Sequence, residues 1–295
     1  MNIPTKSLTS GFELPVYGMG LWQMGGGRWQ SDTSRDAQEI LAIQKAIELG
    51  VTHFDTAESY GAGHSEELLG EAIRGHQREK LVIATKLSGR HGRRDQLLRS
   101  FEGSLKRLGT SYVDLYLLHY YPPAGITISE TMATLDKLVT EGAIRNIGVC
   151  NMTPNRFVEA QRHSANKLVC NQVHYSVQTR EAELAGVIEQ SQQQDVMCVA
   201  WRPLELGVLE PSGLLERVGD KYGMSPYQTA VSWLISQPNV VTLVKTSTLE
   251  HLRENLEAVT MQMEPEDVEL LRARFPNQER VSNSMPLNYA GDVEP

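Results

Sequence analysis

The chain has 295 residues, of which 40% are hydrophobic and 22% are charged, and its formal net charge is −8. This composition is typical of a soluble globular protein, and the chain is long enough for a full core. The acidic balance argues against nucleic acid or an anionic membrane surface as the main partner, because a phosphate-binding basic stripe is missing.

Three cysteines, none in a C-x-x-C pair, indicate neither a disulfide framework nor a zinc-ligand spacing, so no metal centre is expected. No stretch approaches the roughly 20 apolar residues of a membrane span, and the first residues lack the apolar run of a signal peptide. We therefore expect a cytoplasmic protein. No feature of the sequence predicts an oligomeric state.

The chain begins with a predicted hairpin, residues 6–8 and 12–14, around the turn at 9–11. Glycines 25–27 predict a loop without regular structure. Elsewhere, short apolar runs predict strands, and apolar residues at helical spacing predict helices. The predicted strands are residues 16–21, 52–55, 81–86, 113–119, 144–150, 168–173, 196–201 and 240–244. The predicted helices are residues 36–49, 65–74, 94–108, 128–141, 154–163, 184–194, 214–222, 226–236, 249–258 and 266–274.

Eight strand–helix units follow one another without a linker-like break, so we expect one domain over residues 1–295. The near-continuous apolar strands fit a parallel sheet that is buried on both faces. Eight units at this length favour a closed (β/α)8 TIM barrel of the α/β class over an open doubly wound sheet. The N-terminal hairpin and extra C-terminal helices would be additions to this barrel.

Three successive predicted strands end at an ionisable residue, and these residues are Asp55, Lys86 and His119. Tyr60 follows Asp55 on the next loop. Because the carboxyl ends of barrel strands carry the chemistry of such folds, we expect these side chains to converge. Asp55 and Lys86 alone could be a structural ion pair, but the combination of all four favours a site that donates a proton.

A free tyrosine has a pKa of about 10, which is poorly matched to proton transfer near pH 7. We expect the Lys86 ammonium to favour the phenolate and to lower the pKa of Tyr60 by roughly 1–3 units. Asp55 would offset the cost of burying Lys86, and His119 could hydrogen-bond a substrate carbonyl oxygen. Because no nucleophile or metal cluster is evident, the expected attacking group is a hydride from a bound cofactor.

The segment GVTHFDTAESYG at residues 50–61 resembles the signature of the aldo-keto reductases. The resemblance implies reversible reduction of aldehydes or ketones by NADPH, with Tyr60 as general acid in a catalytic tetrad of Asp55, Tyr60, Lys86 and His119. It extends over most of the chain. Further similar segments are GMGLW at 18–22, SEELLG at 65–70, ATK at 84–86, DLYLLH at 114–119, GAIRNIGVCN at 142–151, NQV at 171–173 and REN at 253–255.

The resemblance also implies which residues would hold the nicotinamide half of the cofactor. Asn151 and Gln172 match the pair that hydrogen-bonds the carboxamide, and Cys150 occupies the position of the usual serine. Trp201 falls where an aromatic ring stacks on the nicotinamide. An arginine at the adjacent position, Arg202, could meet a pyrophosphate oxygen.

Near the C-terminus, the resemblance implies contacts to the adenosine half. His251 aligns with a frequent arginine, and Val244 stands where proline is common. NADPH is the expected cofactor, and NADH is the less favoured alternative. The positions that match contacts to the 2′-phosphate and the adenine are Lys245, Thr246, Glu254 and Asn255.

The expected partner is a small carbonyl compound, and Trp22, Trp29 and Tyr120 are candidates to line its binding site. Specificity in this fold resides on variable loops, here residues 21–35, 119–126 and the tail after 275. The uncharged residues at 120–123 suit an apolar or aromatic carbonyl.

Two alternative functions have weaker support in the sequence. A nucleotide-sensing barrel would bind NADPH with negligible turnover, and the complete tetrad favours an enzyme over it. A barrel isomerase without nicotinamide conflicts with residues 245–255. The pair Gly18-x-Gly20 lacks the third glycine of a dinucleotide fingerprint, and the chain has no Tyr-x-x-x-Lys of short-chain dehydrogenases.

Overall fold

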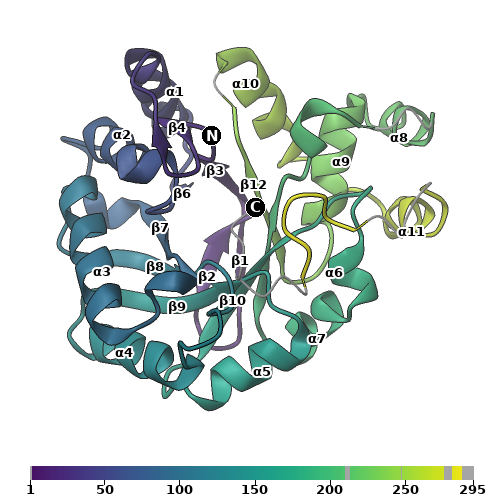
Figure 1. Ribbon diagram of the computed structural model, residues 1–295. Coiled ribbons are helices and arrows are strands. Elements are labelled where there is room, and N and C mark those ends of the chain that lie inside the picture. The colour runs from purple at the N-terminus through teal and green to yellow at the C-terminus, as the bar shows by residue number, and fades with distance from the viewer. Residues whose placement is uncertain (1, 210–212, 247, 276–280, 288–295) are drawn as a thin grey trace.

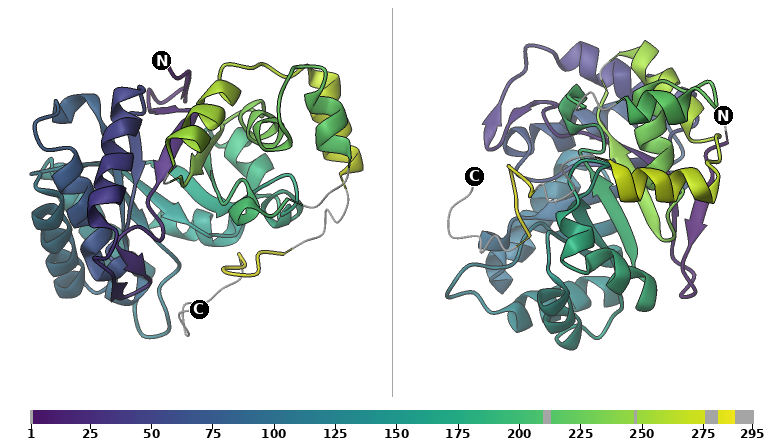
Figure 2. Two further views of the ribbon diagram at one scale, coloured as in Figure 1. Left: turned by 90° about the horizontal axis from the view of Figure 1, so that it is seen from above. Right: turned by 90° about the vertical axis from the view of Figure 1, so that its right-hand side faces the viewer.

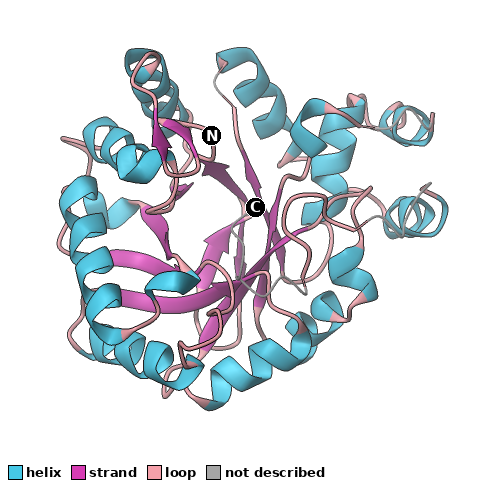
Figure 3. Cartoon of the chain, viewed as in Figure 1, coloured by secondary structure: helices cyan, strands magenta, loops and turns pink. Residues whose placement is uncertain are grey.

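The structure, a computed structural model, describes residues 2–209, 213–246, 248–275 and 281–287. Eight parallel strands close into a barrel, and helices form a ring outside it (Figure 1). Figure 3 shows the same arrangement coloured by secondary structure, with strands inside and helices outside. The expected (β/α)8 barrel is therefore confirmed.

Each barrel strand pairs with the next one along the chain, and the last strand pairs with the first to close the barrel. The strands lie close to their predicted positions, because short apolar runs between turn residues are local signals. In chain order they are β3 (Tyr17–Gly20), β6 (His53–Asp55), β7 (Val82–Leu87), β8 (Val113–Leu118), β9 (Ile144–Cys150), β10 (Leu168–His174), β11 (Met197–Trp201) and β12 (Val240–Val244).

The helices bury one apolar face against the strands and begin and end at recognisable caps. For example, the helix at 226–235 starts with a capping box in which Ser225 and Gln228 exchange hydrogen bonds. The helices are α1 (Asp36–Glu48), α2 (His64–Ala72), α3 (Arg94–Leu108), α4 (Ile128–Thr140), α5 (Pro154–Arg162), α6 (Glu181–Leu184), α7 (Val187–Gln193), α8 (Leu214–Gly219), α9 (Pro226–Ile235), α10 (Leu249–Ala258) and α11 (Pro265–Arg274). Short 3-10 turns are η1 (Gly61–Gly63), η2 (Arg78–Lys80), η3 (Gly89–His91) and η4 (Glu205–Gly207).

Two local predictions were wrong. The glycine-rich segment is not a plain loop, because β4 (Gly26–Gly27) and β5 (Gln30–Ser31) pair as a small antiparallel hairpin. The helix predicted at 184–194 starts too early: α6 ends at Leu184, and the predicted range corresponds to α7, which begins at Val187. The two helices are separated at Gly186, whose φ of 79° is incompatible with a continuous right-handed helix.

The predicted N-terminal hairpin forms from β1 (Thr5–Ser7) and β2 (Glu13–Pro15). Its Leu8 and Leu14 belong to the apolar cluster inside the barrel, together with Leu115 and Leu117 of β8. This cluster fills the barrel interior below the strand ends, and two larger apolar clusters lie between the strands and the outer helices. The interior is therefore packed, and the chemistry is left to one end.

Residues 281–287 lie apart from α11 in both views of Figure 2. Their polar contacts are with α6 and the end of β10: the Ser282 and Leu287 amides donate to Glu181 of α6, and the Ser282 hydroxyl is 2.9 Å from His174 Nδ1. This segment thus reaches the carboxyl end of β10. Among the described residues, no helix combines the length and apolar character that crossing a membrane requires.

Candidate active site

The catalytic candidates lie at the carboxyl ends of three neighbouring strands. Asp55 is the last residue of β6, Lys86 lies near the end of β7, and His119 directly follows β8. Parallel pairing places Asp55 opposite Ala84 and Lys86 opposite Leu117. The three side chains are therefore brought to the same end of the barrel, as their positions in the sequence predict.

The Lys86 ammonium connects the other groups of this site. Its Nζ donates to Asp55 in a buried ion pair, to the Thr56 backbone oxygen at 2.8 Å and to the Tyr60 hydroxyl at 3.1 Å. Lys86 is fully buried, and Tyr60 is 8% exposed. Because an ammonium has three protons to donate, these three acceptors use all of them and hold the charge against the Tyr60 oxygen.

Burial decides the ionisation of Tyr60. It raises the pKa of the phenol above its usual range, and the neighbouring Lys86 ammonium offsets this only in part because the Asp55 carboxylate acts against it. The expected lowering of the Tyr60 pKa is therefore not found. Burial disfavours the Lys86 ammonium too, but the negative charge of Asp55, and that of Tyr60 when it is ionised, outweigh it, so the pKa of Lys86 is raised and the group stays charged.

His119 is neutral in this environment. Burial, followed by the charges of Lys86 and Arg28, holds its pKa well below its usual range. Its ring lies edge-on to Tyr60, with ring centroids 5.7 Å apart. Within the described part of the chain, His119 Nδ1 has no hydrogen-bond partner. The imidazole can therefore serve as a neutral hydrogen-bonding group beside the phenol.

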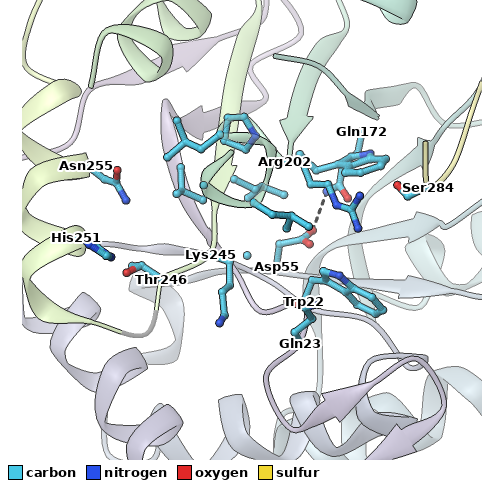
Figure 4. Close-up of a pocket in the computed structure, with 18 of the residues that line it drawn as sticks. Trp22, Gln23, Asp55, Gln172, Arg202, Lys245, Thr246, His251, Asn255 and Ser284 are labelled. Atoms are coloured by element: carbon cyan, nitrogen blue, oxygen red, sulfur yellow. Dashed lines mark hydrogen bonds between the residues drawn. The ribbon is translucent and has the colours of Figure 1, made fainter. Parts of the chain in front are cut away.

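A cavity of about 830 Å³ opens above these strand ends (Figure 4). The cavity extends from Asp55 to α10. It is therefore longer than the four catalytic side chains alone would require. The predicted site residues that line it are Trp22, Asp55, Tyr60, His119, Asn151, Gln172, Trp201, Arg202, Lys245, Thr246, Glu254 and Asn255.

Four predicted residues do not line the cavity. Lys86 lies behind Tyr60, and Cys150 is buried with its thiol 3.9 Å from Gln172 Oε1. Burial raises the pKa of this thiol far above its usual range, so it is an unreactive group. Tyr120 is buried with its hydroxyl 2.6 Å from the Ser88 hydroxyl.

Trp29 is 38% exposed and packs edge-on against His91, with ring centroids 5.9 Å apart. Like Tyr120, it lies outside the lining of the cavity, whereas Trp22 is part of it. Trp22 packs edge-on against the Tyr60 ring at a centroid distance of 4.9 Å. The position of an aromatic residue along a loop does not determine whether its ring faces the cavity. Packing against neighbouring residues decides that Trp22 lines the cavity and that Trp29 and Tyr120 do not.

The two amide side chains are oriented by neighbouring groups. Gln172 Nε2 donates to the Asp55 carboxylate at 2.8 Å. The Asn151 oxygen accepts from Trp201 Nε1 at 3.1 Å, and its amide nitrogen lies 3.2 Å from the His119 backbone oxygen and 2.9 Å from Met285 Sδ. Both amides therefore point into the end of the cavity that holds Tyr60.

His174 was not predicted as a site residue, and its ring packs against the Trp201 ring. The two rings stack with centroids 4.4 Å apart and an interplanar angle of 20°. His174 Nε2 lies 3.2 Å from Glu205, a residue of the loop that follows β11. A usable signal existed, because His174 comes two residues after Gln172 and alternate strand residues share a face.

The far end of the cavity is formed by the segment after β12 and by α10. Lys245 is exposed, and its pKa is lowered by burial of part of the side chain and by Arg35. Glu254 accepts a hydrogen bond from the Ser225 hydroxyl at 2.7 Å. In Figure 4, Lys245 and Thr246 lie between the Asp55 end and this α10 end.

Comparisons with known proteins show the family of this chain. The model of the Aldo/keto reductase family matches residues 17–274, so the chain belongs to this family. Among its relatives, the methylglyoxal reductase of Escherichia coli strain K12 is 32% identical over 269 residues, covering 89% of this chain and 92% of that protein. The glyoxal reductase of Bacillus subtilis is 29% identical over 271 residues, covering 91% and 92%.

Solved structures give the same result. A thermostable aldo-keto reductase in complex with the inhibitor epalrestat superposes with a TM-score of 0.88 at 42% identity, covering 91% of this chain and 98% of that one. An aldo-keto reductase from Klebsiella pneumoniae in complex with NADPH superposes with a TM-score of 0.82 at 30% identity, covering 95% and 98%. The fold and the family are therefore shown together.

Proposed function

We propose that this protein reduces aldehydes or ketones to alcohols with NADPH, and that Tyr60 is the general acid. The observation that carries the proposal is the placement of the Tyr60 hydroxyl at the cavity wall, 3.1 Å from the ammonium of Lys86. Lys86 in turn is held by Asp55. A proton donor, a cation behind it and a neutral imidazole beside it suit the protonation of a carbonyl oxygen.

The residues of the cavity fit NADPH. Asn151 and Gln172 offer amide groups for a carboxamide, and the Trp201 ring lines the same end. The exposed ammonium of Lys245 beside Thr246 suits the 2′-phosphate that distinguishes NADPH from NADH. Glu254 and Asn255 would contact the adenine. When bound, NADPH supplies the hydride that reduces the carbonyl carbon.

The chain's own residues handle the proton. Because burial raises the pKa of Tyr60, the phenol carries its proton at neutral pH and is ready to donate it. When the proton passes to the carbonyl oxygen, the negative charge left on the Tyr60 oxygen faces the Lys86 ammonium at hydrogen-bond distance. Neutral His119 would hydrogen-bond the carbonyl oxygen and orient it toward the phenol.

The test replaces Tyr60 by Phe. The variant Tyr60→Phe should lose about 10²–10⁴-fold in turnover, the usual contribution of general acid catalysis. It should still bind NADPH, as measured by the change in NADPH fluorescence on titration. The matched control is Tyr116→Phe. Tyr116 is fully buried, and its hydroxyl has no hydrogen-bond partner among the described residues. Wild-type turnover in Tyr60→Phe would refute the assignment of the acid.

The substrates to assay first are methylglyoxal and glyoxal, because two relatives of this chain are named as reductases of these compounds. Each is added to protein and NADPH in one cuvette. Loss of NADPH signal that depends on the carbonyl supports the reductase. Binding without oxidation by any aldehyde or ketone would favour a sensor that holds NADPH without turnover.

A further inference from the structure

Two arginines line the cavity at the end that holds Tyr60 and His119. Arg28 lies in the turn of the β4–β5 hairpin, and Arg202 directly follows β11, so distant parts of the chain supply them. In Figure 4, Arg202 is placed with Asp55, Gln172 and Trp22, away from the group at Lys245 and His251. These two cations are not needed for the proton transfer described above.

Arg28 is held next to the general acid by its backbone. Arg28 and Tyr60 form an isolated antiparallel bridge, and the Trp29 amide donates to the Ser59 backbone oxygen at 2.8 Å. The Arg28 guanidinium lies 5.8 Å from the centre of the Trp22 ring, and that ring packs on Tyr60. The position of the Arg28 backbone relative to Tyr60 is therefore fixed by hydrogen bonds between the two segments.

Arg202 directly follows β11 and lines the same cavity. Its backbone has a φ of 53°, in the left-handed region, and its guanidinium lies 5.5 Å from the centre of the Trp201 ring. The neighbouring carboxylate, Glu205, is already bonded to Ser176, Thr179 and His174. Burial lowers the pKa of Arg202, and the charge of Glu205 opposes this effect.

The carboxylates that line the cavity are committed to other partners. Asp55 is paired with Lys86 and accepts from Gln172, and Glu254, at the α10 end, accepts from Ser225. Arg28 and Arg202 therefore bring two positive charges to the catalytic end of a chain whose net charge is −8. Such a local positive potential attracts an anionic ligand and not a neutral one.

We propose that Arg28 and Arg202 form an anion subsite, and that the preferred substrates are carbonyl compounds that carry a carboxylate or a phosphate group. This inference rests on the proposed reductase function and names its substrate class. A guanidinium matches the oxygens of either anion with paired hydrogen bonds. An anion held there would orient the carbonyl of the same molecule toward Tyr60 and His119.

The proposal replaces the expectation of an apolar or aromatic substrate, which relied on residues 120–123. Tyr120 is buried away from the cavity, so these residues do not define its polarity. A competing role exists for Arg202, which could instead contact the pyrophosphate of NADPH. The experiment below separates the two roles by measuring cofactor binding and substrate preference independently.

The experiment compares 4-carboxybenzaldehyde with its methyl ester, which has the same reactive aldehyde without the charge. In the wild-type protein, kcat/KM should be about tenfold higher or more for the acid, and this advantage should shrink as salt is raised. In Arg28→Gln and Arg202→Gln, kcat/KM for the acid should fall roughly 10- to 100-fold, as for a lost charged hydrogen bond. The ester should change less than about threefold.

The control is Arg99→Gln, which removes the same charge from the exposed face of α3 and should alter neither substrate. NADPH dissociation constants, measured by fluorescence, should stay near wild type in Arg28→Gln and Arg202→Gln. Equal rates for acid and ester in the wild type would overturn the proposal. The proposal would also be overturned if both arginine variants bound NADPH more weakly but kept the wild-type preference for the acid over the ester. Failure to reduce both of these aldehydes and also methylglyoxal and glyoxal would instead refute the reductase function itself.

Discussion

At the scale of single residues, the Asp55–Lys86 pair serves both stability and chemistry. Both side chains are buried, and each charge is compensated mainly by the other. Removing one partner of a buried pair leaves the other charge without compensation, which is costly even where the intact pair adds little net stability. The same ammonium is the group that would stabilise the Tyr60 phenolate.

We therefore predict that Lys86→Met unfolds more easily than the wild type by about 3–5 kcal/mol and loses nearly all turnover. The double variant Lys86→Met with Asp55→Asn should recover much of the stability, because no buried charge is left, but none of the turnover. Urea unfolding and NADPH oxidation measure the two effects. Equal stability of the single and double variants would show that the carboxylate is not left unpaired.

At the scale of elements, the β4–β5 hairpin and the loop that carries Tyr60 are packed tightly together. Gly61 has a φ of 59°, and a Cβ added there would lie 2.3 Å from the Gly25 backbone oxygen. Only glycine meets both requirements without movement of the hairpin. The position of Tyr60 in the site thus depends on a contact between two loops.

Gly61→Ala should therefore displace the Tyr60 loop and lower turnover at least tenfold, with a loss of about 1–3 kcal/mol in stability. Gly75→Ala is the matched control, because Gly75 also has a positive φ, 85°, but nothing lies within 4 Å of an added Cβ. It should cost stability of about 1 kcal/mol and leave turnover unchanged. Turnover of Gly61→Ala at the wild-type level would contradict this account.

At the scale of the whole molecule, buried histidines make folding sensitive to acid. His53 of β6 is fully buried, both its ring nitrogens lack hydrogen-bond partners among the described residues, and burial lowers its pKa to about 4. Because the pKa of an unfolded histidine is about 6.5, the unfolded chain binds a proton first as the pH falls. The stability contributed by neutral His53 is thus fully present above pH 6.5 and is lost toward pH 4.

Between pH 7 and pH 5, this one group should cost up to about 2 kcal/mol of unfolding free energy. In His53→Gln the fall over the same interval should be smaller by that amount, while the exposed control His76→Gln should follow the wild type. Urea unfolding at both pH values measures the difference. Identical falls in His53→Gln and in the wild type would show that His53 does not remain neutral.

The order of strands and helices was predictable because its signals are local. Apolar runs, helical spacing and caps specify each element from its own residues, and the parallel barrel then places the strand ends together. Asp55, Lys86 and His119 could be recognised as a group for this reason. The β4–β5 hairpin was missed because its glycines carry no periodic pattern, and the break at Gly186 because a short apolar segment continued beyond it.

By itself, the sequence determined the barrel, the ends of its strands and the family, all of which depend on short-range patterns and on residue identity. Only the tertiary structure decided the direction of the Tyr60 pKa, because burial depends on neighbours from several strands. It also decided that Tyr120 faces away from the cavity while Arg28 and Arg202 line it. These residues come from segments far apart in the chain, and no local pattern encodes that they line the same cavity.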